Sequence, residues 1–161
     1  AVADDPRVDT IGVFNSGVQP PAAADAGGNG RSAGAAGGTG GRAAGAGSRA
    51  GGGAAFPTTD ALAKIHTPTL YLNGGEPDFM MATSKANFDA INHVPIFYGS
   101  RANAGHSATY FHPGGGEFAN VAVAWLDWQL KGDEKASAMF VGEKCGLCTN
   151  PNWETHAKGL Q

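Results

Sequence analysis

The chain has 161 residues, which is enough for one domain with a moderate hydrophobic core. It carries 11 Lys and Arg residues against 14 Asp and Glu residues, a net charge of -3 without a basic stripe, so nothing in the charge pattern favours nucleic-acid binding. No apolar run approaches the roughly 18 residues of a membrane-spanning helix, and the first residues, AVADDPRV, lack the basic start and apolar segment of a signal peptide.

The first strand is predicted at residues 8–14, VDTIGVF. Apolar and β-branched side chains fill this run, and the following NSG is typical of a turn. A Gly- and Ala-rich segment comes next: residues 22–55 hold 13 glycines and 13 alanines. Because this composition buries too little apolar area to offset chain entropy, we predict a low-complexity insert over residues 19–57. A glycine-rich assembly element is the alternative, although its glycines lack the three-residue period of collagen.

Strands and helices alternate after the insert. Residues 68–73 and 94–98 predict strands, and residues 82–92 and 117–131 predict helices. Gly132 follows the second helix, where it is typical of a C-cap. One face of that helix, at a spacing of 3.6 residues, is formed by Phe118, Val121, Ala122, Trp125 and Leu126.

This alternation predicts a parallel sheet of the α/β class, with residues 1–18 and 58–161 as two parts of one domain. In such sheets, functional residues gather at the carboxyl ends of the strands. Polar segments follow all three predicted strands: NSG, then GGEPD, then GSRANAGHS. We therefore expect a functional site at this edge of the sheet.

His106 is the candidate general base at this edge. An imidazole titrates near neutral pH, and the small residues around it would let a substrate approach. The orienting acid would be Asp78 or Glu76, and we favour Asp78 because one strand–helix–strand passage would bring its loop beside that of His106. The alternatives are a structural histidine and solvated turn carboxylates.

Two cysteines, Cys145 and Cys148, form the motif CGLC near the end of the chain. A zinc site would need further ligands, and a redox CxxC motif usually opens a helix after a strand. We favour a structural disulfide, which would indicate an oxidising compartment. Free thiols and a redox or metal role remain as alternatives.

Taken together, the GEPD and GH motifs and the final helix FANVAVAWLDWQLKGD resemble the last third of an α/β-hydrolase. More narrowly, the chain resembles secreted esterases and polyester-hydrolase-like members of that superfamily, over residues 4–18 and 60–160. The resemblance implies part of an α/β-hydrolase sheet with flanking helices, Asp78 as the acid and His106 as the base of a catalytic triad. It also implies a secreted protein and no metal or organic cofactor.

The nucleophile of that family is a serine in a G-x-S-x-G turn, which the resemblance places before the DPRV segment and hence outside this chain. GRSAG at residues 30–34 fits the pattern, but no hydrophobic strand precedes Ser32, and Ser16 lacks the first glycine. We therefore expect this chain to supply the acid and the histidine of a serine-type ester hydrolase and to be inactive alone. The alternative is a non-catalytic structural or self-assembling chain derived from the fold.

The expected substrate is a small or polymeric ester. Tyr110 and Phe111 are candidates to line its acyl or aromatic pocket, with core packing as the alternative. A missing half would leave an open sheet edge, so we also expect either self-association or a complementary N-terminal half that covers it.

Overall fold

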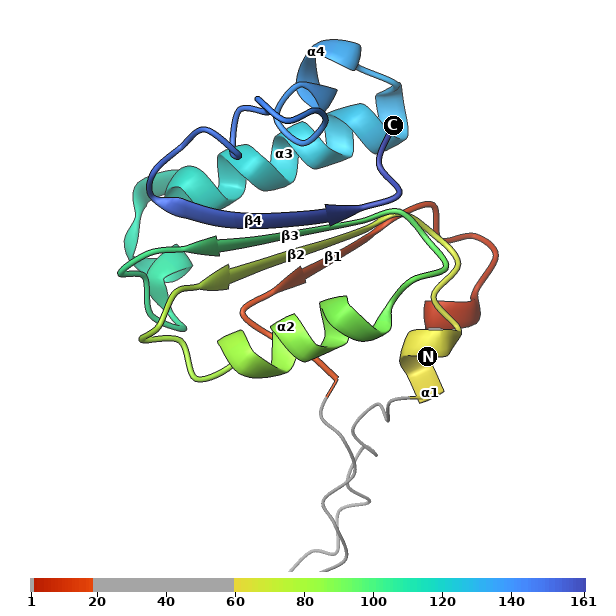
Figure 1. The fold of residues 1–161 in the computed structure, drawn as a ribbon, viewed down its shortest axis with the longest axis horizontal. Coiled ribbons are helices and arrows are strands. Elements are labelled where there is room, and N and C mark those ends of the chain that lie inside the picture. The colour runs from red at the N-terminus through yellow and green to blue at the C-terminus, as the bar shows by residue number, and fades with distance from the viewer. Residues whose placement is uncertain (1, 19–59) are drawn as a thin grey trace, which may run out of the picture.

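The computed structural model describes residues 2–18 and 60–161 (Figure 1). The insert predicted over residues 19–57 lies outside the described residues. Four strands form one sheet in the order β1-β2-β3-β4. Their bounds are Ile11–Phe14 for β1, Thr69–Gly74 for β2, Ile96–Arg101 for β3 and Trp153–Lys158 for β4.

The sheet is mostly parallel. β1 pairs with β2 and β2 with β3 in parallel, as the alternating pattern predicts, whereas β4 pairs with β3 in the antiparallel direction. β4 is not among the predicted strands, because its sequence, WETHAK, is mostly polar and follows the turn-like TNPN. The general α/β class is therefore confirmed, with a mixed sheet in place of a purely parallel one.

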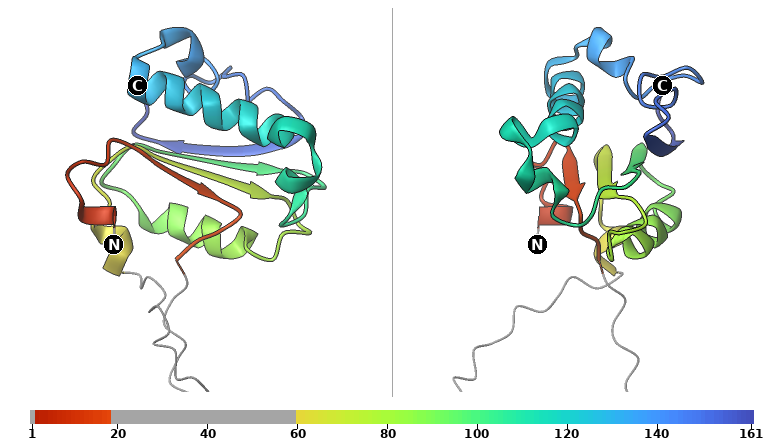
Figure 2. Two further views of the ribbon diagram at one scale, coloured as in Figure 1. Left: turned by 180° about the vertical axis from the view of Figure 1, so that it is seen from behind. Right: turned by 90° about the vertical axis from the view of Figure 1, so that its left-hand side faces the viewer.

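Two main helices cover opposite faces of the sheet. α2 (Met81–Ala90) lies on one face and α3 (Gly116–Lys131) on the other (Figures 1 and 2). Short helices α1 (Asp60–Ala63) and α4 (Glu134–Ser137) precede β2 and follow α3. Single turns of 3-10 helix lie at Val2–Asp4, Ala108–Phe111 and Pro113–Gly115.

Side chains on the two faces of the sheet belong to two separate apolar clusters. On the α3 side, Leu70, Leu72 and Phe97 pack with Trp125 and Phe140. The cluster on the α2 side is formed by Leu62, Ile65, Tyr71, Phe88, Ile91, Ile96 and Tyr98. Every residue of β2 is buried because the strand is covered on both faces, which explains its almost continuous apolar sequence.

The buried face of α3 follows the predicted pattern, with one correction. Phe118, Val121 and Trp125 are buried, but Leu126 is exposed. Leu126 is one residue and therefore about 100° beyond Trp125, which places it on the flank of the helix instead of the face against the sheet. The predicted C-cap at Gly132 is confirmed: its φ is 69°, and its N–H donates to the carbonyls of Asp127 and Trp128.

Candidate functional site

The carboxyl ends of β1, β2 and β3 meet at one edge of the sheet, at the arrowheads in Figure 1. Asp78 lies in the loop between β2 and α2, and His106 lies in the loop after β3. The polar segments that the sequence analysis singled out are therefore neighbours in space.

Asp78 and His106 are in direct contact. Nδ1 of His106 lies 2.9 Å from Oδ1 of Asp78. The side chain of Asp78 is 0% exposed and that of His106 is 35% exposed. The carboxylate is therefore buried, while the imidazole is partly accessible to solvent. Glu76, the other candidate acid, is exposed and makes no recorded contact with His106 among the described residues.

Backbone groups hold the Asp78 carboxylate. Oδ2 accepts a hydrogen bond from the N–H of Gly74 at 3.0 Å, and Oδ1 accepts one from the N–H of Met80 at 2.9 Å. These bonds compensate part of the cost of burying a charged carboxylate. A carboxylate fixed in this way orients the imidazole that donates to it.

Glycines let the two loops approach each other closely. The N–H of Gly75 donates to the carbonyl of Ala104 at 2.9 Å, which ties the Asp78 loop to the His106 loop. A Cβ on Gly74 would lie 2.2 Å from the same Ala104 oxygen, so this position excludes any side chain. The two glycines of GGEPD thus have a packing role that the motif alone did not reveal.

His106 has two further neighbours that the sequence analysis missed as site residues. The side-chain amide of Asn15, just after β1, donates to the main-chain carbonyl of His106. Asn15 has a φ of 45°, a left-handed conformation that asparagine tolerates in turns. The asparagine of NSG was therefore the sequence signal for a special backbone position here. The ring of Phe79 lies 4.1 Å from the His106 ring, centroid to centroid, although Phe79 itself is largely exposed.

This arrangement gives the imidazole a defined chemistry. When neutral His106 donates from Nδ1 to Asp78, its Nε2 carries the lone pair and can accept a proton. Within the part of the chain that the structure describes, no hydrogen bond to Nε2 is recorded. The pair therefore has the geometry of a general base with its orienting acid. Nε2 of His106 is the atom of the pair that can take a proton.

No described residue fills the position of a nucleophile. Ser16 and Ser107 are both exposed, and neither hydroxyl hydrogen-bonds His106 among the described residues. Cys145 and Cys148 form a disulfide with each other, so neither offers a free thiol as a nucleophile. Ser32 lies outside the described residues.

The candidate pocket residues do not pack in the core as far as the structure describes them. Phe111 is largely exposed, so the core-packing alternative is wrong for it. The side chain of Tyr110 lies outside what the structure describes. A neighbouring surface pocket of about 330 Å³ is lined in part by Arg101, His112 and Glu117, and Arg101 and Glu117 form an ion pair there.

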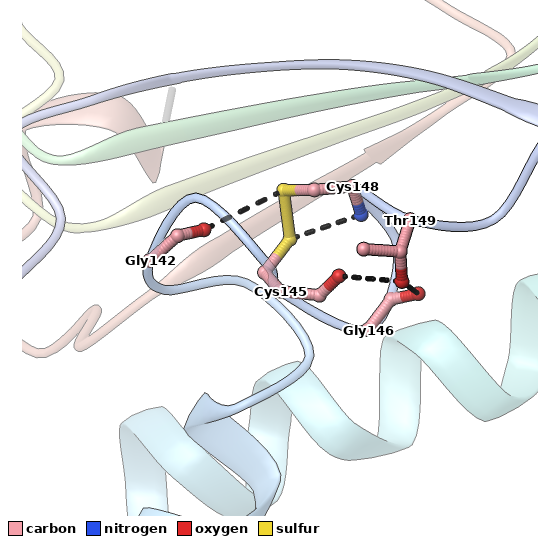
Figure 3. Close-up of a disulfide and its surroundings, with 5 residues drawn as sticks. All are labelled: Gly142, Cys145, Gly146, Cys148 and Thr149. Atoms are coloured by element: carbon pink, nitrogen blue, oxygen red, sulfur yellow. Dashed lines mark hydrogen bonds between the residues drawn. A yellow bond between two sulfur atoms is a disulfide. The ribbon is translucent and has the colours of Figure 1, made fainter.

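Cys145 and Cys148 form the disulfide that the sequence analysis favoured (Figure 3). Their Cα atoms are 4.9 Å apart, and the N–H of Cys148 also donates to Sγ of Cys145. Cys145 is buried against the α3-side cluster, so the bridge shapes the loop between α4 and β4. The pair is compatible with an oxidising compartment.

Among the described residues, no group of three or more His, Cys, Asp or Glu side chains is placed to hold a metal ion. No described helix is long and apolar enough to cross a membrane. No protein-family model matches the sequence, and no curated protein matches it.

Proposed function

We propose that this chain supplies the acid and the base of a serine-type carboxylic ester hydrolase with an α/β-hydrolase-like fold. The observation that carries the proposal is the buried Asp78 carboxylate at 2.9 Å from Nδ1 of His106, at the carboxyl edge of a mostly parallel sheet. Ligands and catalytic groups collect at this edge in α/β proteins.

In this mechanism, Nε2 of His106 removes the proton from a serine hydroxyl while its oxygen attacks the ester carbonyl. Asp78 stabilises the imidazolium that forms. The imidazolium then gives the proton to the departing alcohol, which leaves an acyl-serine. A water molecule, deprotonated by the same Nε2, attacks the acyl-serine. The carboxylic acid leaves, and the imidazolium returns the proton to the serine oxygen, which regenerates the hydroxyl and the neutral base. The serine comes from outside the described residues.

The surroundings of His106 support an ester with an apolar or aromatic group. Phe79 packs against the imidazole and keeps most of its surface exposed, and Phe111 is also exposed at the end of the following loop. An exposed aromatic ring beside a reactive group, as Phe79 is here, is suited to bind apolar parts of a substrate. The disulfide supports a secreted protein, since such bonds persist in oxidising compartments.

One observation supports a second function, that of a non-catalytic chain derived from this fold. No described hydroxyl hydrogen-bonds the His106 ring and neither cysteine is free, so the pair has no bound nucleophile within the described residues. In that case the Asp78–His106 bond would serve only to join two loops.

The test uses the complete protein that carries this sequence and measures hydrolysis of p-nitrophenyl butyrate. We expect His106→Ala to lower kcat by about 10⁶-fold. The matched control is His156→Ala, because His156 also pairs with a carboxylate but lies on β4, away from the strand ends.

Three outcomes are informative. A large loss in His106→Ala with near-normal activity in His156→Ala supports the hydrolase. Equal losses in both variants would point to a general structural defect and contradict the assignment of His106 as the base. A wild-type protein without ester turnover, or a His106→Ala variant with unchanged turnover, favours the non-catalytic alternative.

A further inference from the structure

The disulfide of the CGLC motif closes a very short loop. Cys145 and Cys148 are the two cysteines of the chain, and their bond joins positions only three apart. A disulfide stabilises a fold mainly by restricting the unfolded chain, and this restriction decreases with the length of the loop that the bond closes. By this measure the Cys145–Cys148 bond adds little to the stability of the fold.

Contacts other than the disulfide hold this loop in place. The N–H of Gly146 donates to the carbonyl of Ala138 at 2.9 Å, and the N–H of Leu147 donates to that of Met139 at 3.2 Å. Leu147 is buried and packs in the α3-side cluster. None of these contacts uses a sulfur atom, so we expect the loop to keep its conformation when the disulfide opens.

The two sulfur-bearing residues differ in their access to solvent. Cys145 is 2% exposed and belongs to the α3-side cluster, whereas Cys148 is exposed. A thiol attacks a disulfide at the sulfur that it can reach, and the other sulfur leaves as a thiolate. A thiol from solvent therefore attacks Sγ of Cys148, and Cys145 is the leaving group.

Cys145 has a hydrogen bond that suits a leaving group. The N–H of Cys148 donates to Sγ of Cys145 at 3.0 Å (Figure 3). A disulfide sulfur is a weak acceptor, but a thiolate carries a full negative charge and binds the same N–H more strongly. The hydrogen bond thus stabilises the opened form more than the closed form, which makes Cys145 a better leaving group.

Cys148 also has a neighbour that suits its reduced form. Its Sγ lies 3.8 Å from the carbonyl oxygen of Gly142 (Figure 3). A disulfide sulfur has no hydrogen to donate, whereas the S–H of a thiol can donate to this carbonyl. Both cysteines therefore have polar partners for the dithiol, in a loop that other contacts hold in place.

We propose that Cys145–Cys148 is a thiol–disulfide exchange site, which opens and closes in the folded protein by reaction with thiols from solvent. In the first step, a thiolate sulfur bonds to Sγ of Cys148, the bond between the two cysteines breaks, and its electron pair stays on Sγ of Cys145. A second thiolate then attacks the sulfur of the bound partner, and Cys148 leaves as a thiolate.

The balance of this reaction is complete. The two partner thiols are oxidised to a disulfide, the cysteine pair is reduced to two thiols, and the two protons of the partner thiols end on Cys145 and Cys148. The reverse sequence, with a disulfide from solvent, closes the bond again.

Reduction of the native full chain with dithiothreitol tests this proposal. At timed intervals the free thiols are blocked with N-ethylmaleimide in acidic urea, and the intact mass gives the reduced fraction. Because Cys148 is exposed in the folded protein, we expect a rate constant within about 100-fold of that for the same chain unfolded in urea. A bond that is reached only through global unfolding would open at least about 10³-fold more slowly than in urea.

Two results of this experiment would overturn the proposal. One is a native rate constant more than about 100-fold below that of the unfolded chain. The other is a loss of the helix and sheet signals in circular dichroism when the bond is reduced, since we expect the reduced chain to keep its fold. Neither readout depends on the proposed hydrolase activity.

Glutathione, a monothiol, identifies the sulfur that is attacked. After the same blocking step, peptide mass spectrometry should find glutathione on Cys148 and N-ethylmaleimide on Cys145, in at least about tenfold excess over the reverse arrangement. A ratio near one, or an excess of glutathione on Cys145, contradicts the proposal. This measurement uses the wild-type chain and so does not depend on whether a variant folds.

Two single-thiol variants give a matched comparison with oxidised glutathione. Cys145→Ser keeps the exposed Cys148 thiol, and Cys148→Ser keeps the buried Cys145 thiol. We expect the mixed disulfide to form at least about tenfold faster in Cys145→Ser, because its thiol is reached from solvent. Equal rates, or a faster reaction in Cys148→Ser, in variants that circular dichroism shows to be folded would overturn the assignment of Cys148 as the attacked sulfur.

Discussion

Two histidine–carboxylate pairs in this chain have the same nitrogen–oxygen distance and very different surroundings. Asp78–His106 and Glu154–His156 both have a separation of 2.9 Å. The Asp78 side chain is 0% exposed and accepts two backbone N–H bonds, whereas the Glu154 side chain is 55% exposed on an edge strand. Distance alone thus does not distinguish a site from a surface contact; burial and backbone support do.

The two rings also use different nitrogens. His106 contacts its carboxylate through Nδ1, and its Nε2 makes no hydrogen bond within the described residues, whereas His156 contacts Glu154 through Nε2. The loop of His106 is fixed by Asn15 and Phe79, while His156 lies over Phe88 and Tyr98 in the middle of β4. Only the first ring lies in a loop at the carboxyl ends of the parallel strands.

The largest expected effect separates the two pairs by activity. Asp78→Asn removes the carboxylate that orients His106 and stabilises its imidazolium, so kcat/KM for p-nitrophenyl butyrate should fall by about 10³- to 10⁴-fold in the complete protein. Glu154→Gln, the matched change in the exposed pair, should leave kcat/KM within about twofold. Comparable losses in both variants would erase the distinction between the pairs.

A second prediction compares the pairs by stability. Asp78→Ala deprives the N–H groups of Gly74 and Met80 of this acceptor in a buried site, and we expect the free energy of unfolding to fall by about 3 kcal/mol. Glu154→Ala removes an exposed ion pair and should cost less than about 0.5 kcal/mol. Urea unfolding followed by tryptophan fluorescence measures both, and a cost for Asp78→Ala as small as that for Glu154→Ala would contradict the structural role of the buried carboxylate.

A third prediction concerns the tyrosines below the exposed pair. Burial raises the pKa of Tyr71 to about 12 from its ordinary value of 10.0, and burial also raises the pKa of Tyr98. The unfolded chain loses these protons first, so stability is complete below pH 10 and falls as the pH rises toward 12, by about 3 kcal/mol for Tyr71.

Urea unfolding at a series of alkaline pH values measures this loss. Tyr71→Phe cannot ionise and should show a smaller alkaline loss, while His156→Ala should show the same loss as the wild type, because the tyrosines and not the exposed pair are responsible. A wild-type chain equally stable at pH 9 and at pH 11.5 would rule out this contribution.

The smallest expected effect concerns the ring packed on His106. Phe79→Ala removes the contact at 4.1 Å and loosens the imidazole, so kcat should fall by about tenfold while the fold stays intact, since Phe79 is largely exposed. Phe79→Leu keeps apolar bulk and should recover part of the rate. An unchanged kcat in Phe79→Ala would contradict a role of Phe79 in holding the imidazole and would show that the contacts with Asp78 and Asn15 are sufficient.

Much of the buried half of the site could be predicted from sequence because it depends on local patterns. Apolar runs ending in GGEPD and GSRANAGHS mark the ends of β2 and β3, and parallel pairing then brings Asp78 beside His106. The preference for Asp78 over Glu76 agrees with the geometry, in which Glu76 is exposed. The catalytic roles themselves stay predictions.

The rest depends on contacts between distant residues, which no local pattern encodes. Asn15 contacts His106 across 91 positions, and NSG by itself indicates only a turn. β4 was missed because an edge strand that is half polar has no strong periodic signal. The exposure of Leu126 depends on how α3 lies over the sheet, which the 3.6-residue period does not specify.

Gly74 offers a way to follow the Asp78 loop without any enzyme assay. Its missing side chain leaves room for the Ala104 carbonyl, and its N–H binds the buried carboxylate, so the position serves steric and polar needs at once. A saturation library at this codon, sorted only for soluble display of folded protein, should return glycine almost alone. The same sorting at codon 105, where a Cβ would meet nothing within 4 Å, should return many residue types.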